Sequence, residues 1–151
     1  MPDTLTNEVI ANKLTIAQIA VYWPQLRKPL MKGLGRIEES TMSNIYDNLI
    51  DGPLDLWLLS SREEEPHVVG VVLGGVTLDL LIGYRNYLIY AAYTLESVEN
   101  DAWKSIFSTI EAWAIRRKCT RLVAYTQTSR VLEIAKLIGA KATMTMMEKE
   151  L

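Results

Sequence analysis

The chain has 151 residues, of which 49% are hydrophobic and 23% charged, with a formal net charge of −2, which excludes nucleic-acid binding through bulk positive charge. A single cysteine and a single histidine exclude an internal disulfide and a metal site built on these residue types. The longest apolar run, Val68–Leu81, is too short to span a bilayer, so we expect one domain over residues 1–151 in a reducing cytoplasm, with neither membrane nor nucleic acid as partner.

The first part of the chain is predicted to contain one strand and two helices. A short strand is expected at Asn7–Ala11, and Thr15 begins a helix with a glutamine three residues on, as in a capping box. Pro24 and Pro29 predict a kink or a break, so this helix is expected in one or two pieces. A second helix fits Thr41–Ile50, whose apolar residues recur at helical spacing.

Strand patterns follow in the middle of the chain. Short apolar runs bounded by polar turns predict strands, and the pair of glycines at 74 and 75 predicts a bulge or a splayed point inside them. A tight turn at residues 83–86 predicts that the last two runs pair antiparallel. Three strands are expected: Leu54–Ser60, the run Val68–Leu73 that resumes after the glycines as Val76–Ile82, and Tyr87–Tyr93.

The last third of the chain alternates helices and strands. A helix from about Glu99 to Lys118 carries one apolar stripe, and Gly139 is expected to end a second helix, Thr128–Ile138. Strands are expected at Arg121–Tyr125 and Lys141–Glu148. The whole order predicts an α/β (α+β) fold, in which helices flank both faces of a mixed, mainly antiparallel sheet.

This order of elements resembles the GNAT (N-acetyltransferase-like) fold, and its C-terminal part is similar to small tailed-bacteriophage proteins with that fold. The segments that carry the second likeness are Glu111-Ala112-Trp113-Ala114, Arg121-Leu122-Val123-Ala124-Tyr125, Arg130-Val131-Leu132, Leu137-Ile138-Gly139-Ala140 and Met147-Glu148-Lys149-Glu150-Leu151. The resemblance implies an accessory or connector-associated protein at the head–tail junction. Its partners would be portal or neck components, met in several symmetric copies in the host cytoplasm or in the virion.

The turn before the long helix decides whether the resemblance implies an enzyme. GNAT enzymes hold a pyrophosphate there with glycines, a basic residue and helix amides. The matching stretch of this chain, Leu95–Ala102, has no glycine and no base, but three carboxylates: Glu96, Glu99 and Asp101. Acidic residues also stabilise a first helical turn, and Ser97 can cap it. We therefore expect no cofactor.

An active enzyme would need other residues for its chemistry. The family's proton-donating tyrosine matches Ala135, which has no proton to give, so Tyr125 is the candidate substitute. Glu96 and Asp79 are the carboxylates best placed to act as a base, whereas His67 is expected to be a surface residue in a turn. Acetyl-CoA phosphates would then meet the backbone amides of Val98, Glu99, Asn100 and Asp101.

Two functions, and a less specific third, stay open at this point. The first is a non-catalytic bacteriophage accessory protein with a degenerate acetyltransferase fold, in which Tyr84 and Arg85 of the turn at 83–86 contact the partner. The alternative is an acyl-CoA-dependent N-acetyltransferase with an atypical cofactor loop. The third, an inhibitor of a host enzyme, is selected by no residue.

Overall fold

The computed structural model describes residues 8–35, 38–125, 129–141 and 147–151. Within them the chain forms five strands and four helices, and most bounds lie within two residues of those expected from the sequence. In chain order they are β1 Val9–Lys13, α1 Ile16–Leu34, α2 Glu39–Ile50, β2 Leu54–Ser61, β3 Val68–Leu78, β4 Arg85–Thr94, α3 Asn100–Arg116, β5 Arg121–Ala124 and α4 Ser129–Leu137.

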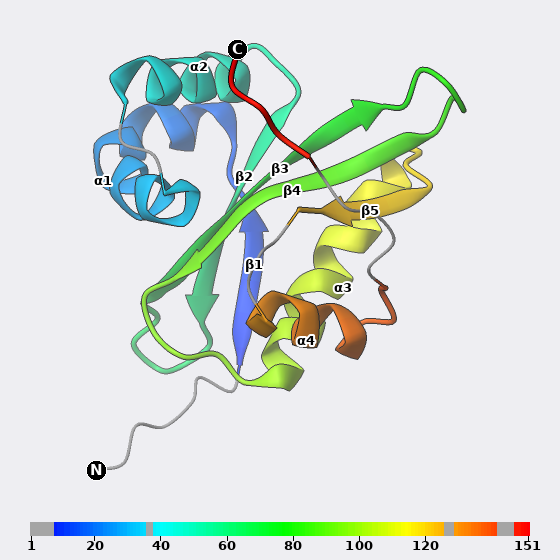
Figure 1. Ribbon diagram of the computed structural model, residues 1–151. Helices are drawn as coiled ribbons and strands as arrows, with labels where there is room; N and C mark the ends of the chain where they lie inside the picture. The colour runs from blue at the N-terminus through cyan, green and yellow to red at the C-terminus, as the bar shows by residue number, and fades with distance from the viewer. Residues whose placement is uncertain (1–7, 36–37, 126–128, 142–146) are drawn as a thin grey trace.

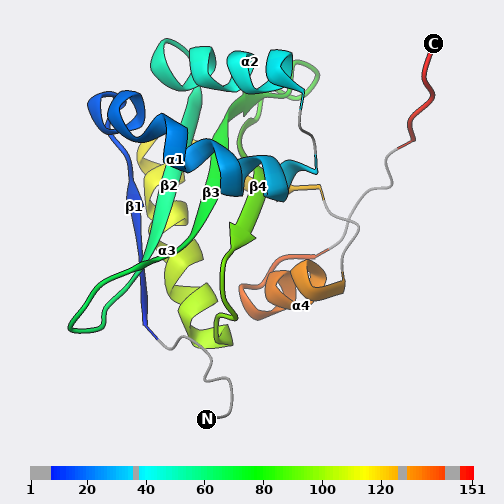
Figure 2. The ribbon, with the colours of Figure 1, turned by 90° about the vertical axis from the view of Figure 1, so that its left-hand side faces the viewer.

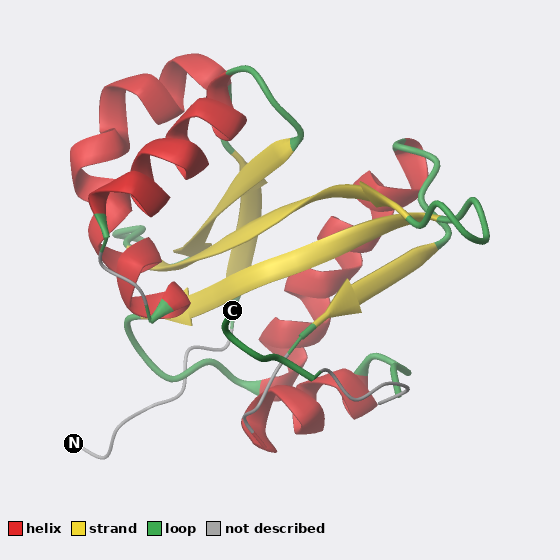
Figure 3. Ribbon diagram, turned by 45° about the horizontal axis from the view of Figure 1, so that its top comes forward, coloured by secondary structure: helices red, strands yellow, loops and turns green. Residues whose placement is uncertain are grey.

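The strands form one sheet in the order β1-β2-β3-β4-β5, antiparallel except for the parallel pair of β4 and β5. Figures 1 and 2 show α1 and α2 on one face of this sheet and α3 and α4 on the other. Coloured by secondary structure, the same arrangement reads as a sheet between two helical layers (Figure 3). The predicted fold class is therefore confirmed.

Each face of the sheet buries its own apolar cluster, because β2, β3 and β4 carry apolar side chains on both faces. The stripe of α3, with Ile106 and Ile110 fully buried, packs on one face. Leu30 of α1 and Met42 of α2 pack on the other. Every helix of this pair of layers therefore buries one stripe and leaves its opposite side to water.

The helix α1 runs unbroken from Ile16 to Leu34 although Pro24 and Pro29 lie inside it. The expected break is absent, because Leu26 and Leu30, which follow the two prolines, are buried against the sheet and favour continuation of the helix. The expected capping box is present: Thr15 Oγ1 accepts from the amide of the glutamine at N3, whose side chain accepts from the Thr15 amide.

The strand β4 carries the irregularity that the glycine pair predicted. The register between β3 and β4 shifts between Leu73, which pairs with Ala91, and Gly74, which pairs with Ile89. Tyr90 is therefore the extra residue, and the bulge lies on β4 rather than on the glycine strand. The strand β5 pairs with β4 only from Asn86 to Ile89 among the described residues, so β4 continues beyond the bulge without it.

A buried polar network ties the start of β4 to β2 and α3. Trp57 Nε1 donates to Tyr87 Oη (2.9 Å), and Tyr87 Oη donates to Asp55 Oδ2 (2.9 Å). Trp113 Nε1 donates to the same carboxylate oxygen (3.1 Å), and Lys13 Nζ lies 3.8 Å from the other one. Burial raises the pKa of Tyr87, so its hydroxyl keeps its proton and stays a donor to Asp55.

Two of the expected strands were predicted to end at Ile82 and to span Lys141–Glu148. The strand predicted to reach Ile82 ends at Leu78, because Asp79 starts a turn in which its Oδ1 accepts from the amide of Leu81 (3.0 Å). Asp79 therefore does not interrupt a strand. Most of the expected strand Lys141–Glu148, residues 142–146, lies outside the described residues.

Candidate functional site

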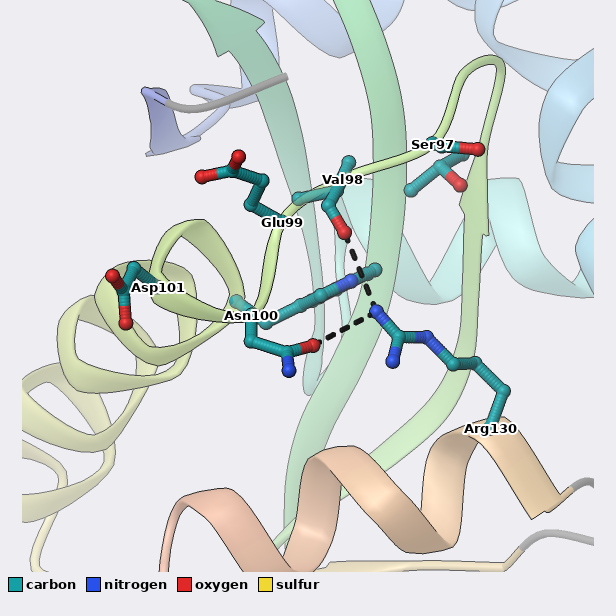
Figure 4. Close-up of a pocket in the computed structure, with 8 residues that line it drawn as sticks. Ser97, Val98, Glu99, Asn100, Asp101 and Arg130 are labelled. Carbon is teal, nitrogen blue, oxygen red and sulfur yellow. Dashed lines mark hydrogen bonds between the residues drawn. The ribbon is translucent and has the colours of Figure 1, made fainter. Parts of the chain in front are cut away.

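A pocket of about 740 Å³ lies where the end of β4 and the starts of α3 and α4 meet (Figure 4). All four residues of Val98–Asp101 line it, and their amides were the predicted cofactor contacts of an active enzyme. The loop therefore does border a cavity, despite its missing glycines. The residues that line it are Thr94, Ser97, Val98, Glu99, Asn100, Asp101, Trp103 and Arg130.

The start of α3 presents amides that no side chain caps. Glu99 occupies the N-cap position with extended backbone, φ −67° and ψ 156°, and makes no side-chain cap hydrogen bond. Ser97, the predicted cap, lies before this position and lines the pocket instead. The first amides of a helix have no partner within the helix, and they form the positive end of its dipole. This end of α3 therefore offers donors to an anion in the pocket.

A cation that the loop itself lacks comes from α4. Arg130 Nη2 donates to Asn100 Oδ1 (3.1 Å) and to the carbonyl of Val98 (3.4 Å), as the dashed lines in Figure 4 show. Its Nη1 lies 3.4 Å from Glu133 of the same helix. Sequence reasoning missed this residue because Arg130 follows the loop by some thirty positions, and no local pattern joins them.

The carboxylates of the loop do not converge on this cation. Glu99 and Asp101 border the pocket, but their side chains extend away from Arg130 (Figure 4). The carboxylate of Glu96 is hydrogen-bonded to Nε2 of His67, and Glu96 is not among the residues that line the pocket. The sequence of the loop predicted that its carboxylates would repel a phosphate. Because their side chains extend away from Arg130, this repulsion is reduced.

The pairing of Glu96 belongs to a cluster that joins two loops. Ser61, buried at the end of β2, has its Oγ 3.0 Å from Nδ1 of His67 and accepts from the His67 amide (3.2 Å). The hydrogen bond to Glu96 raises the pKa of His67 above its ordinary value of 6.5, with a smaller contribution from Glu63. His67 is a surface residue in a turn, as predicted, but its bond to the loop before α3 was not foreseen.

The described pairing of β4 with β5 ends beside the bulge of β4. The last pair is Ile89 with Ala124, and the next residue of β4 is the bulged Tyr90. Tyr125 directly follows that pair, and both tyrosines are exposed. The predicted proton donor therefore directly follows the last described pair of the two strands, and Tyr90 is a second exposed phenol next to that pair, which the sequence did not single out.

The predicted partner-contact residues lie at the far end of β4. Tyr84 is half exposed, and the Arg121 guanidinium lies 5.0 Å from its ring centre. Arg85 Nε and Nη2 both donate to the carbonyl of Arg117, at 3.2 and 3.0 Å. Arg85 thus ties the hairpin to the end of α3.

The described residues contain no group of three or more His, Cys, Asp or Glu side chains that could hold a metal ion. None of their helices is both long enough and apolar enough to cross a membrane.

No protein family model matches the chain, and no curated protein sequence does. Solved structures match nearly all of it. They include AAC(6')-Iy in complex with the bisubstrate analog CoA-S-monomethyl-acetylneamine, with a TM-score of 0.72 and 11% identity over 95% of this chain and 98% of that one. A GNAT family acetyltransferase of Staphylococcus aureus matches with a TM-score of 0.66 and 13% identity over 95% and 99%.

A third match is the predicted acetyltransferase of Clostridium acetobutylicum with acetyl-CoA, with a TM-score of 0.66 and 14% identity over 94% of this chain and 96% of that one. At these identities the matches establish the fold, and the expected GNAT fold is confirmed.

Two expectations are overturned by these matches. The non-catalytic bacteriophage accessory protein is contradicted because the matched structures are acetyltransferases, and no observation links the chain to a bacteriophage. The absence of a cofactor is contradicted by matches solved with CoA derivatives. Both errors came from judging the loop by its own residues, whereas Arg130 reaches it from α4. Portal or neck partners, symmetric copies and the contact at Tyr84 and Arg85 are untested.

Proposed function

We propose that this chain is an acyl-CoA-dependent N-acyltransferase with an atypical cofactor loop. The observation that carries the proposal is the pocket at the start of α3, where Arg130 stands beside uncapped helix amides while the neighbouring carboxylates extend away. The resemblance of the fold to acetyltransferases supports it.

The residues of the pocket suit a diphosphate. Helix N-terminal amides bind phosphate oxygens through directed N–H groups, and here Asn100 and Asp101 begin the helix at the pocket wall. The guanidinium of Arg130 supplies the counter-charge, in the planar form that suits phosphate. Like charges a few ångströms apart cost on the order of 1 kcal/mol in a wet site, and the outward directions of Glu99 and Asp101 lessen that cost.

The reaction also needs groups that position substrates and move protons. A bound acyl-CoA would supply a thioester-activated acyl group to an acceptor amine. Tyr125, directly after the last described pair of β4 with β5, is the proposed donor, through its Oη, of the proton that a departing thiolate takes up. Glu96 is the proposed base, and its hydrogen bond to His67 also holds the start of the loop.

Isothermal titration with acetyl-CoA and with free CoA tests the proposal. We expect low micromolar binding, and we expect Arg130→Gln to weaken it by about tenfold or more, since a hydrogen bond to a charged group contributes roughly 1.5–3 kcal/mol. Arg27→Gln is the matched control, because Arg27 pairs with Glu39 in a separate groove between α1 and α2. The absence of heat at millimolar acetyl-CoA with the folded wild-type protein would exclude this function.

A further inference from the structure

The turn between β3 and β4 exposes an unusual run of apolar side chains. We call residues Leu78–Tyr84 the hairpin tip. Leu80, Leu81 and Ile82 are 86%, 96% and 54% exposed, and Leu78 and Tyr84 beside them are exposed as well. Figure 1 shows this turn projecting past the end of the sheet. Single exposed apolar residues are ordinary, but a contiguous group on a protrusion marks an interaction site.

The hairpin tip is held in one shape by its own hydrogen bonds. The Asp79 amide donates to the carbonyl of Tyr84 (2.8 Å), and the Gly83 amide donates to the carbonyl of Asp79 (2.8 Å). Gly83 has a φ of 72°, which side chains rarely adopt, and Asp79 Oδ1 accepts from the Leu81 amide (3.0 Å). The leucines are therefore presented outward by an ordered turn, which lowers the entropic cost of binding.

Cationic residues on the neighbouring elements lie near the base of the hairpin tip. We call the exposed cationic residues of β4, of β5 and of the end of α3 the basic collar. The Arg121 guanidinium lies over the ring of Tyr84, and the bonds of Arg85 to Arg117 bring the end of α3 beside the turn. The basic collar consists of Arg85, Arg116, Arg117, Lys118 and Arg121.

This local charge opposes that of the whole chain, whose formal net charge is −2. The acidic residue of the turn, Asp79, lies 3.9 Å from Arg121 and offsets one of the cations. The basic collar therefore keeps an excess of cations beside the exposed apolar side chains of the hairpin tip.

We propose that the hairpin tip inserts into the surface of an anionic lipid bilayer, with the basic collar against the lipid headgroups. Leucines that enter the acyl boundary, an aromatic ring at the headgroup level and flanking cations are the elements of peripheral membrane contact. Such a contact needs no spanning segment, so it revises the expectation that no membrane is a partner, which rested on the length of the apolar runs.

Other occupants suit the hairpin tip less well. A second copy meeting it tip to tip would bring two basic collars together, and like charges repel. A convex apolar tip would otherwise need an apolar hollow on its partner. Two pockets formed by the described residues, one at the start of α3 and one between α1 and α2, are both lined by charged side chains, among them Asp101 and Arg130 in the first and Arg27 and Glu39 in the second.

Co-sedimentation with vesicles tests this inference, using phosphatidylcholine alone and phosphatidylcholine mixed with phosphatidylglycerol. We expect retention on the anionic vesicles, little on the neutral ones, and a decline as salt is added. The double variant Leu80→Ser, Leu81→Ser should lose about tenfold or more in apparent affinity, since both side chains are free of the core. Val21→Ser, at a residue 68% exposed on α1, is the matched control and should bind like wild type.

A second variant tests the charge separately. Lys118→Gln with Arg116→Gln should weaken retention and flatten its dependence on salt, while circular dichroism shows an unchanged fold. Equal retention on neutral and anionic vesicles, or no retention on either, would overturn the inference. A dimer in sedimentation velocity that the leucine double variant abolishes, without any vesicle binding, would assign the hairpin tip to a second copy instead. None of these readouts depends on acyltransferase activity.

Discussion

Replacing Tyr87 by phenylalanine is expected to destabilise the protein by about 2–4 kcal/mol. The hydroxyl of this fully buried residue accepts from Trp57 Nε1 and donates to Asp55. Its removal leaves the buried indole N–H of Trp57 without its acceptor, which costs roughly 1–3 kcal/mol. It also removes a hydrogen bond to a charged group, worth roughly 1.5–3 kcal/mol, of which Asp55 recovers part through its remaining partner Trp113.

Urea unfolding followed by circular dichroism measures this effect. With an m-value of about 2 kcal/mol/M, the midpoint should fall by roughly 1–2 M. Tyr90→Phe is the matched control, because Tyr90 lies on the same strand with its side chain exposed, and it should leave the midpoint unchanged. A Tyr87→Phe midpoint within about 0.25 M of wild type, at an unchanged m-value, would refute the reasoning that this network anchors β4.

Three further predictions concern the site and its supports. Because Glu96 raises the pKa of His67, the pair adds stability that is fully present below pH 6.5 and is lost as the pH rises through the folded-state pKa. Urea unfolding should therefore separate wild type from His67→Gln more at about pH 6 than at about pH 8.5, and a gap that widens at alkaline pH would contradict this sign. Gly74→Ala would place a Cβ 2.6 Å from Cε1 of the anchored Tyr87 ring, so thermal unfolding should show a loss of about 1–3 kcal/mol, and wild-type stability would show that the ring can move. If the proposed function holds, Tyr125→Phe should lower kcat by about 100-fold in a thiol-release assay while the KM for acetyl-CoA stays constant, and an unchanged kcat would remove Tyr125 as proton donor.

Local patterns were sufficient for most of the secondary structure. The capping box at Thr15 and the apolar stripe of α3 depend on residues three or four positions apart, so both can be read from the chain. The glycines at 74 and 75 located the bulge to within one strand. The prolines of α1 misled the same reasoning, because burial against the sheet decides whether the helix continues, and burial is not a local property.

The site shows the same division more sharply. The loop has no glycine and no basic residue but three carboxylates, and this composition led to the wrong expectation that no cofactor binds there. Which way Glu99 and Asp101 extend, and which cation reaches the loop, depends on how α4 packs beside α3. His67 and Glu96 likewise meet only because the turn before β3 and the loop after β4 lie at the same end of the sheet.

The sequence by itself determined the order of elements, the fold class and the chemical character of each loop, because propensity, capping and apolar periodicity act between near neighbours along the chain. The tertiary structure decided that Arg130 reaches the start of α3, that the described pairing of β4 with β5 ends at Ile89, and that two leucines and an isoleucine of the hairpin tip stay outside the core. Each of these depends on contacts, or on the lack of contacts, between distant segments, and such segments come together only when the sheet and its two helical layers assemble.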